Sequence, residues 1–237
     1  VCSSDLALYN IVDSIFVSKL SESALTAVTL AFPLQGLMIA VGSGTGVGIN
    51  ALLSRALGQK KFDESDSAAN TGIFLAILSF SLFLLLGLFV AEPFIKSQSD
   101  NQEIVGYGST YLKIVCILSI GLFFQMTFER LLQSTGQTLY SMISQLTGAV
   151  INIIFDPIMI FGLFGFPKLG IAGAAYATIF GQTVATVIGL TANIRKNKEL
   201  HLSLKKILKP NLKIMGRIYM VGIPSILMMA ICSVMSY

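Results

Sequence analysis

Apolar runs of about 20 residues recur along this chain, separated by short polar turns. A helix of about 20 apolar residues spans the ~30 Å hydrocarbon layer of a bilayer. Such runs cover residues 7–20, which is short, and then 24–54, 68–95, 105–134, 139–164 and 169–194, and a seventh begins near Arg217. The chain is therefore predicted to be an all-α membrane protein, a polytopic helical bundle of six transmembrane helices plus the start of a seventh.

The composition excludes a soluble domain. Charged residues make up 12% of the chain, whereas soluble domains carry about 25%. The net charge of +4 needs no nucleic acid to explain it, because basic residues concentrate in the cytoplasmic loops of membrane proteins. The three cysteines are scattered, and His201 has no partner of ligand type at a useful spacing. We expect the lipid bilayer as a partner, no nucleic acid, no cofactor and no metal centre.

The distribution of Lys and Arg predicts the orientation. Twelve of the 16 basic residues lie in or near the loops after the second, fourth and sixth spans. The positive-inside rule places these loops in the cytoplasm, so the N-terminus is also expected there, in a multi-pass protein of the cell membrane.

The same pattern predicts the domain organisation. Residues 1–6, "VCSSDL", resemble the translation of a sequencing adapter and are interpreted as a remnant. Residues 7–197 form the first six-helix unit, residues 198–216 a cytoplasmic amphipathic linker, and residues 217–237 the start of a second unit. In the linker, apolar residues recur at helical spacing between lysines, which is typical of a helix on the membrane surface; they are Leu200, Leu204, Ile207 and Leu208. The apolar run at each end suggests a fragment of a longer protein.

Glycines cluster in "GSGTGVG", Gly42 to Gly48. The spacing fits neither phosphate-binding motif, and no strand precedes it. It does contain overlapping G-x-x-x-G pairs, which allow close approach of helices in lipid. We interpret the cluster as a packing surface.

Polar residues inside the spans are costly and often mark pathways. Asp13, Asp156 and Thr178 lie at similar distances, about 10 Å, from the outer ends of their helices. Tyr111 lies near the same end, whereas Glu129 lies at a different level, near the cytoplasmic end. Asn152 is one turn from Asp156 and Tyr9 one turn from Asp13. These depths predict one polar site in the outer half of the bundle.

Two buried carboxyls at matched depth are suited to holding a proton or a cation. Burial disfavours the charged form of a carboxyl, and a neighbouring carboxyl disfavours it further. An arriving cation favours the ionised form and displaces the proton. Pro157 gives its helix a place to bend. The structural alternatives are a proline kink or an Asp-Pro cap of a broken helix, and an Asp13 held by hydrogen bonds.

Six ordered segments stand out as motifs: "LYNIVDSIFVSKL" at 8–20, "AFPLQGLMIAVGSGTGVGINALLSRALGQKK" at 31–61, "ERLLQSTGQT" at 129–138, "INIIFDPIMIFG" at 151–162, "GIAGAAYATIFGQ" at 170–182 and "VGIPSIL" at 221–227. In these segments the chain resembles the MATE (multidrug and toxic compound extrusion) family, in its DinF-like branch. The resemblance implies two six-helix lobes that open alternately to either side, of which this fragment holds the N-terminal lobe.

The resemblance also implies roles for single residues. Asp13, Asn152, Asp156 and Thr178 match its H⁺ or Na⁺ coupling-ion site, and Tyr9 and Tyr111 its supporting hydrogen bonds. Glu129 departs from the neutral polar residue that is common in the family, so a second titrating group would modify coupling. The C-terminal-lobe acids of sodium-coupled members lie beyond the fragment, so the coupling ion stays open.

These observations favour a monomeric secondary antiporter, not an enzyme, that exports small amphipathic or cationic compounds in exchange for H⁺ or Na⁺. Its possible substrate path is lined by polar side chains at Gln35, Glu129, Gln145 and Gln182. One alternative is a lipid-linked oligosaccharide flippase, but pyrophosphate would call for several cations in the cleft. The other is an intramembrane aspartyl hydrolase, which needs Asp13 and Asp156 to share a water.

Overall fold

The computed structural model describes residues 11–235 apart from 13, 166, 168, 198–201 and 203. Within this part of the chain, all regular secondary structure is helical. The helices are α2 (Glu22–Gly58), α3 (Phe62–Phe89), α4 (Ala91–Gln98), α5 (Gln102–Ile117), α6 (Ile120–Ser134), α7 (Thr138–Phe161), α8 (Ile171–Arg195), α9 (Leu204–Leu208) and α10 (Leu212–Met235). Residues 14–18 before them are helical as well.

Long apolar helices dominate the fold. Among the described residues, α2, α3, α7, α8 and α10 are each long and apolar enough to cross a membrane. The α5–α6 pair makes a sixth candidate span if the bent pair counts as one. The predicted all-α membrane bundle is therefore confirmed.

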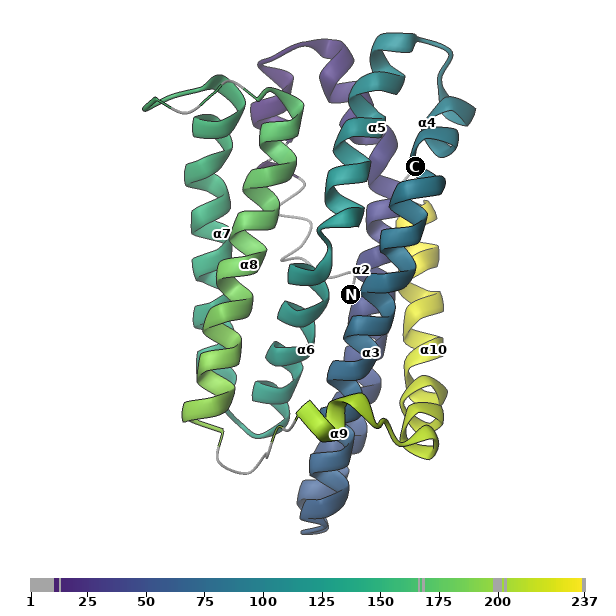
Figure 1. Cartoon of the computed structure of the whole chain (residues 1–237), viewed down its shortest axis with the longest axis vertical. Coiled ribbons are helices and arrows are strands. Elements are labelled where there is room, and N and C mark those ends of the chain that lie inside the picture. The colour runs from purple at the N-terminus through teal and green to yellow at the C-terminus, as the bar shows by residue number, and fades with distance from the viewer. Residues whose placement is uncertain are drawn as a thin grey trace.

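The helices form a bundle with the bent α5–α6 pair between two groups (Figure 1). On one side α7 packs against α8, and on the other α2 packs against α3 and α10. Polar side chains join α6, α7 and α8: Ser144 Oγ donates to the Ala185 carbonyl at 2.7 Å, and Asn193 Nδ2 to the Phe128 carbonyl at 3.2 Å. Such interhelical bonds hold helices together where no water competes.

The predicted span 105–134 is wrong as a single helix. It is broken at Leu118 and Ser119 into α5 and α6, which bend by 47°. Gly121, just after the break, lies against α8, where an added Cβ would be 3.2 Å from Thr183 Oγ1. Thr186 Oγ1 of α8 also donates to the Gly121 carbonyl at 2.7 Å. The bend therefore brings α6 onto α8, a tertiary contact that apolar composition does not encode.

The predicted span 68–95 also differs from the structure. The helix α3 begins earlier, at Phe62, and ends at Phe89, and the short helix α4 follows. Pro93 lies in the first turn of α4, where its missing N–H costs no hydrogen bond. Glu92 of α4 pairs with Lys96 at 3.0 Å and with Lys113 of α5 at 3.5 Å. The hydrogen bond and charge of Lys96, followed by the charge of Lys113, hold the pKa of Glu92 below its usual range.

The linker is less exposed than a surface helix would be. The helix α9 has only five residues and contacts α3. Its Ile207 is buried among core residues that include Ile49, Leu53 and Ile73, whereas Leu208 is exposed. Leu200 lies outside the described residues. The next helix, α10, begins at Leu212, five residues before the predicted start at Arg217.

The glycine cluster packs against two neighbouring helices, as predicted. A Cβ at Gly42 would lie 2.5 Å from Met126 Sδ, and one at Gly46 would lie 2.8 Å from Arg130 Cγ, both on α6. Gly44 and Gly48 face α10 instead, where added Cβ atoms would overlap Ile226 and the Ile218 carbonyl. The overlapping G-x-x-x-G pairs thus let α2 approach α6 with one face and α10 with another.

Candidate functional site

The candidate site lies in the seam between α7 and α8. Two glycines of α8 let the backbones approach there: a Cβ at Gly181 would be 2.6 Å from the Gly148 carbonyl oxygen, and one at Gly173 would be 2.5 Å from that of Met159. Thr178 lies between these two glycines on α8. The close approach brings the short polar side chains of the two helices within hydrogen-bonding reach.

Asn152 and Thr178 meet in this seam. Asn152 Nδ2 donates to Thr178 Oγ1 at 3.2 Å, and Thr178 Oγ1 donates to the Ala174 carbonyl at 3.0 Å. Both side chains are 1% exposed, and Asp156, one turn further along α7, is 0% exposed. The amide of Asn152 is oriented by its bond to Thr178. Its Oδ1 accepts no hydrogen bond from the described residues, which is unusual for a buried amide oxygen.

Tyr111 of α5 is the predicted supporting tyrosine within the described residues. It is fully buried in the core cluster that also contains Ile160 of α7 and Ala174 of α8. Ile160 is one turn from Asp156, and Ala174 is one turn from Thr178. A role for Tyr111 beside Asp156 and Thr178 stays a prediction. The predicted partners Asp13 and Tyr9 lie outside the described residues.

The helix that carries Asp156 is continuous across Pro157. It extends to Phe161 and ends at Gly162, which adopts the left-handed conformation, with φ 72°, that favours glycine. An Asp-Pro cap of a broken helix is therefore not what the structure contains. Proline is tolerated inside a membrane helix where neighbouring groups satisfy the freed carbonyl.

Glu129 lies in a second polar cluster. Its two carboxylate oxygens accept hydrogen bonds from Gln125 Nε2 at 3.1 Å and from Gln145 Nε2 at 2.8 Å. Gln145 and Asp156 are 11 residues apart on α7, about 16 Å along the helix axis at ~1.5 Å per residue. The sequence-based separation of Glu129 from the Asp156 site is therefore confirmed, and the contact between Glu129 and Gln145 was not foreseen.

The other two predicted path residues are buried at separate places. Gln35 of α2 is 4% exposed and Gln182 of α8 is 6% exposed. Gln35 Oε1 accepts no hydrogen bond from the described residues. A substrate path along Gln35, Glu129, Gln145 and Gln182 stays a prediction. Among the described residues, no group of three His, Cys, Asp or Glu side chains could hold a metal ion.

Sequence reasoning missed several polar contacts between helices. Ser134 Oγ of α6 donates to Asn50 Oδ1 of α2 at 2.6 Å, and Asn197 Nδ2 donates to the Leu131 carbonyl at 3.4 Å. The signal was present, because each is a Ser or Asn at the end of an apolar span. Their partners could not be identified, since the rotation of each helix about its axis was unknown.

The Glu129 cluster provides a test of packing. Glu129→Leu is expected to lower the free energy of unfolding by about 2 kcal/mol, because the buried Gln125 and the part-buried Gln145 lose their acceptor at about 1 kcal/mol each. Glu129→Gln keeps one acceptor oxygen and should cost about half as much. Denaturant unfolding of the full chain in detergent, followed by circular dichroism, measures both. A Glu129→Leu variant as stable as the unsubstituted chain would contradict the assigned role.

The fold and the buried polar seam define a polytopic helical membrane protein with a polar site between its spanning helices. Comparison with known proteins identifies the family. The MatE family model matches residues 6–158, which is more than half of the chain. The chain therefore belongs to the MatE family, as the sequence motifs predicted.

Similar proteins agree with this assignment. The chain is 28% identical over 222 residues to the multidrug export protein MepA of Staphylococcus saprophyticus, covering 93% of this chain and 48% of that protein. It is 27% identical over 217 residues to the probable multidrug resistance protein YoeA of Bacillus subtilis, covering 90% of this chain and 47% of that protein. The chain thus spans about half the length of the curated relatives that it matches.

Solved structures show the same similarity. The inward-facing conformation of a multidrug resistance MATE family transporter of the MOP superfamily superposes with a TM-score of 0.89 at 26% identity, covering 96% of this chain and 51% of that one. An outward-facing conformation of such a transporter gives a TM-score of 0.86 at 27% identity, covering 95% of this chain and 49% of that one. The chain belongs to a family of transporters rather than enzymes, as predicted.

Proposed function

We propose that the whole protein is a secondary active antiporter that exports drugs or organic cations across the cytoplasmic membrane in exchange for H⁺ or Na⁺. The observation that carries this proposal is the fully buried Asp156 beside the hydrogen-bonded Asn152–Thr178 pair. An acid buried within a membrane helix is costly and is retained where it handles charge. The names of the similar proteins support export as the process.

The seam offers oxygen atoms that can bind either coupling ion. The carboxylate of Asp156 can bind a proton directly. For Na⁺, which like other hard cations prefers oxygen ligands, the seam adds Asn152 Oδ1 and Thr178 Oγ1 to the carboxylate. We assign Asp13 to the same site, and Tyr9 and Tyr111 to its supporting hydrogen bonds. No other cofactor is required, because the ion gradient supplies the energy.

The orientation and organisation form part of the proposal. The α2–α3 and α6–α7 connections and α9 lie at one end of the bundle, and the α7–α8 connection lies at the other (Figure 1). Since the first group of connections carries most of the Lys and Arg, we place that end and the N-terminus in the cytoplasm. Residues 7–197 would form the N-terminal lobe, residues 198–216 the linker and residues 217–237 the start of a C-terminal lobe, which a complete monomer contains.

A vesicle experiment tests the exchange. The whole protein, reconstituted into vesicles loaded with a fluorescent cationic dye, is expected to release dye several-fold faster when a proton or a sodium gradient is imposed than when none is. The gradient that drives release identifies the coupling ion. Dye release that responds to neither gradient would reject antiport. Release of a fluorescent lipid-linked oligosaccharide instead of dye would favour the flippase alternative, although the described interior offers few cations for pyrophosphate beyond the half-buried Arg130.

A further inference from the structure

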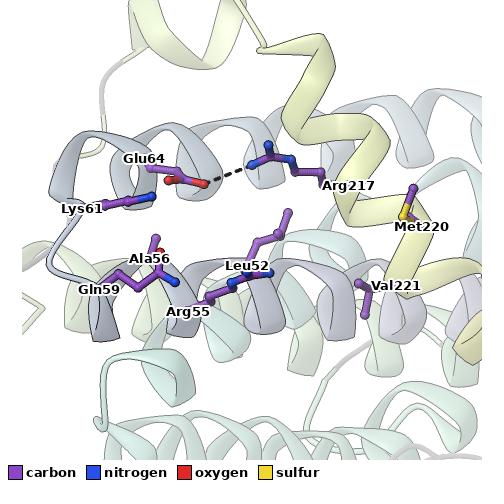
Figure 2. A pocket seen from close by; sticks show the side chains of 9 residues that line it. All are labelled: Leu52, Arg55, Ala56, Gln59, Lys61, Glu64, Arg217, Met220 and Val221. Atoms are coloured by element: carbon purple, nitrogen blue, oxygen red, sulfur yellow. Dashed lines mark hydrogen bonds and ion pairs between the residues drawn. The ribbon is translucent and has the colours of Figure 1, made fainter.

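A cavity of about 420 Å³ opens where the end of α2, the start of α3 and the first turns of α10 meet (Figure 2). It is separate from the seam that holds Asp156. Nine residues line it: Leu52, Arg55, Ala56, Gln59, Lys61, Glu64, Arg217, Met220 and Val221. Its volume is within the range of cavities that bind small molecules.

Three cations and one acid line this cavity. Arg217 Nη1 pairs with Glu64 Oε1 at 3.2 Å, and both side chains remain partly exposed. No described carboxylate lies within ion-pair distance of Arg55 or Lys61. With one cation compensated by Glu64, the cavity keeps an excess of two positive charges. An anion with several oxygen acceptors suits this wall, since Arg binds phosphate with two parallel hydrogen bonds.

Met220 and Val221 of α10 form an apolar wall of the cavity, whereas Leu52 and Ala56 of α2 lie beside Arg55 and Gln59 (Figure 2). Met220 is 77% exposed and Val221 is 40% exposed, and both belong to a helix long and apolar enough to span a membrane. Both lie about one turn deeper along α10 than Arg217, on the part of the helix that is apolar. The cavity therefore combines a basic wall at the helix ends with an apolar wall along the helices.

We propose that this cavity binds the headgroup of an anionic phospholipid, with the phosphate at Arg55, Lys61 and Arg217 and the upper acyl chain along Met220 and Val221. A free phosphate would use the basic wall and leave the apolar wall without a function, so the observations favour the lipid. Basic pockets between spanning helices are known to suit acidic lipid headgroups. Arg55 lies on α2, Lys61 directly precedes α3 and Arg217 lies on α10. A lipid bound to all three would therefore join α10 to α2 and α3. The proposal goes beyond antiport and does not depend on it.

Native mass spectrometry of the full chain in detergent tests the site. Added phosphatidylglycerol is expected to bind as one tightly held molecule per chain, and zwitterionic phosphatidylcholine more weakly, because its choline cation meets a basic wall. Arg55→Gln should weaken phosphatidylglycerol binding about fivefold, the effect of one cation near an anionic lipid. Arg195→Gln is the matched control, since Arg195 is exposed at the same end of the bundle but outside the cavity. It should leave the binding unchanged.

The variant Glu64→Gln distinguishes a specific effect on lipid binding from an effect of misfolding. Removing this carboxylate frees Arg217 and should tighten phosphatidylglycerol binding about fivefold, a gain that misfolding cannot produce. Equal binding of the two lipids, or unchanged binding in both Arg55→Gln and Glu64→Gln, would overturn the proposal. So would full displacement of phosphatidylglycerol by millimolar inorganic phosphate, which would assign the cavity to a soluble anion.

Discussion

Asp156→Asn in the whole protein is expected to reduce gradient-driven dye export to the background of vesicles without protein. The amide has nearly the same shape as the acid but neither takes up a proton nor carries the negative charge that a cation needs. Asp156 is fully buried, and its neighbour Asn152 is bonded to Thr178. Helices α7 and α8 carry no other carboxyl, so neither helix offers a second acid to bind the coupling ion. The loss should appear in export under both proton and sodium gradients.

A matched variant and a folding measurement make this result interpretable. Asp66→Asn is the same change in another buried acid, on α3 and outside the α7–α8 seam, and should retain export. The unfolding temperature of Asp156→Asn should stay close to that of the unsubstituted protein, because the substitution conserves shape. Gradient-driven export that survives in Asp156→Asn would remove this residue from the coupling mechanism and leave the proposed function without its main support.

The sequence predicted the spanning helices well because their length is set by the bilayer. The predicted 24–54, 139–164 and 169–194 correspond to α2, α7 and α8 within a few residues. Depth along antiparallel helices could also be counted. Asp156 and Thr178 were assigned to one level in this way, and Asn152, one turn from Asp156, meets Thr178 in the structure. Both predictions depend only on the rise of the helix and on where each apolar run ends.

Other features depend on tertiary contacts that apolar composition does not report. The break at Leu118 and Ser119 lies in an apolar stretch that reads as continuous, and the bond from Thr186 to the Gly121 carbonyl beyond it joins residues far apart in the sequence. The burial of Ile207 against α3 was missed because an amphipathic pattern is the same whether the partner is lipid or protein. Pro93 was a usable signal for the start of α4. The pairing of Glu129 with Gln145 requires the rotation of two helices, which one sequence does not supply.

Gly181→Ala is expected to destabilise the protein by about 3 kcal/mol and to abolish export. The added Cβ would lie 2.6 Å from the Gly148 carbonyl oxygen and 3.4 Å from Asn152 Cβ, so α7 and α8 must separate. Overpacking against a neighbouring element costs about 1–3 kcal/mol, and a backbone carbonyl has little freedom to move away. The same separation would stretch the Asn152–Thr178 hydrogen bond, which couples the packing of the seam to its function.

Two further alanine variants isolate the cause. Gly173→Ala, whose Cβ would lie 2.5 Å from the Met159 carbonyl oxygen, should behave like Gly181→Ala. Gly216→Ala in α10 meets no atom within 4 Å, so the higher helix propensity of alanine should leave the protein equally stable or more stable by up to about 1 kcal/mol. Denaturant unfolding in detergent and dye export measure all three. If Gly181→Ala matched Gly216→Ala in both measurements, close backbone contact between α7 and α8 would not be what positions Asn152 and Thr178, and the seam would have to be held by its side chains alone.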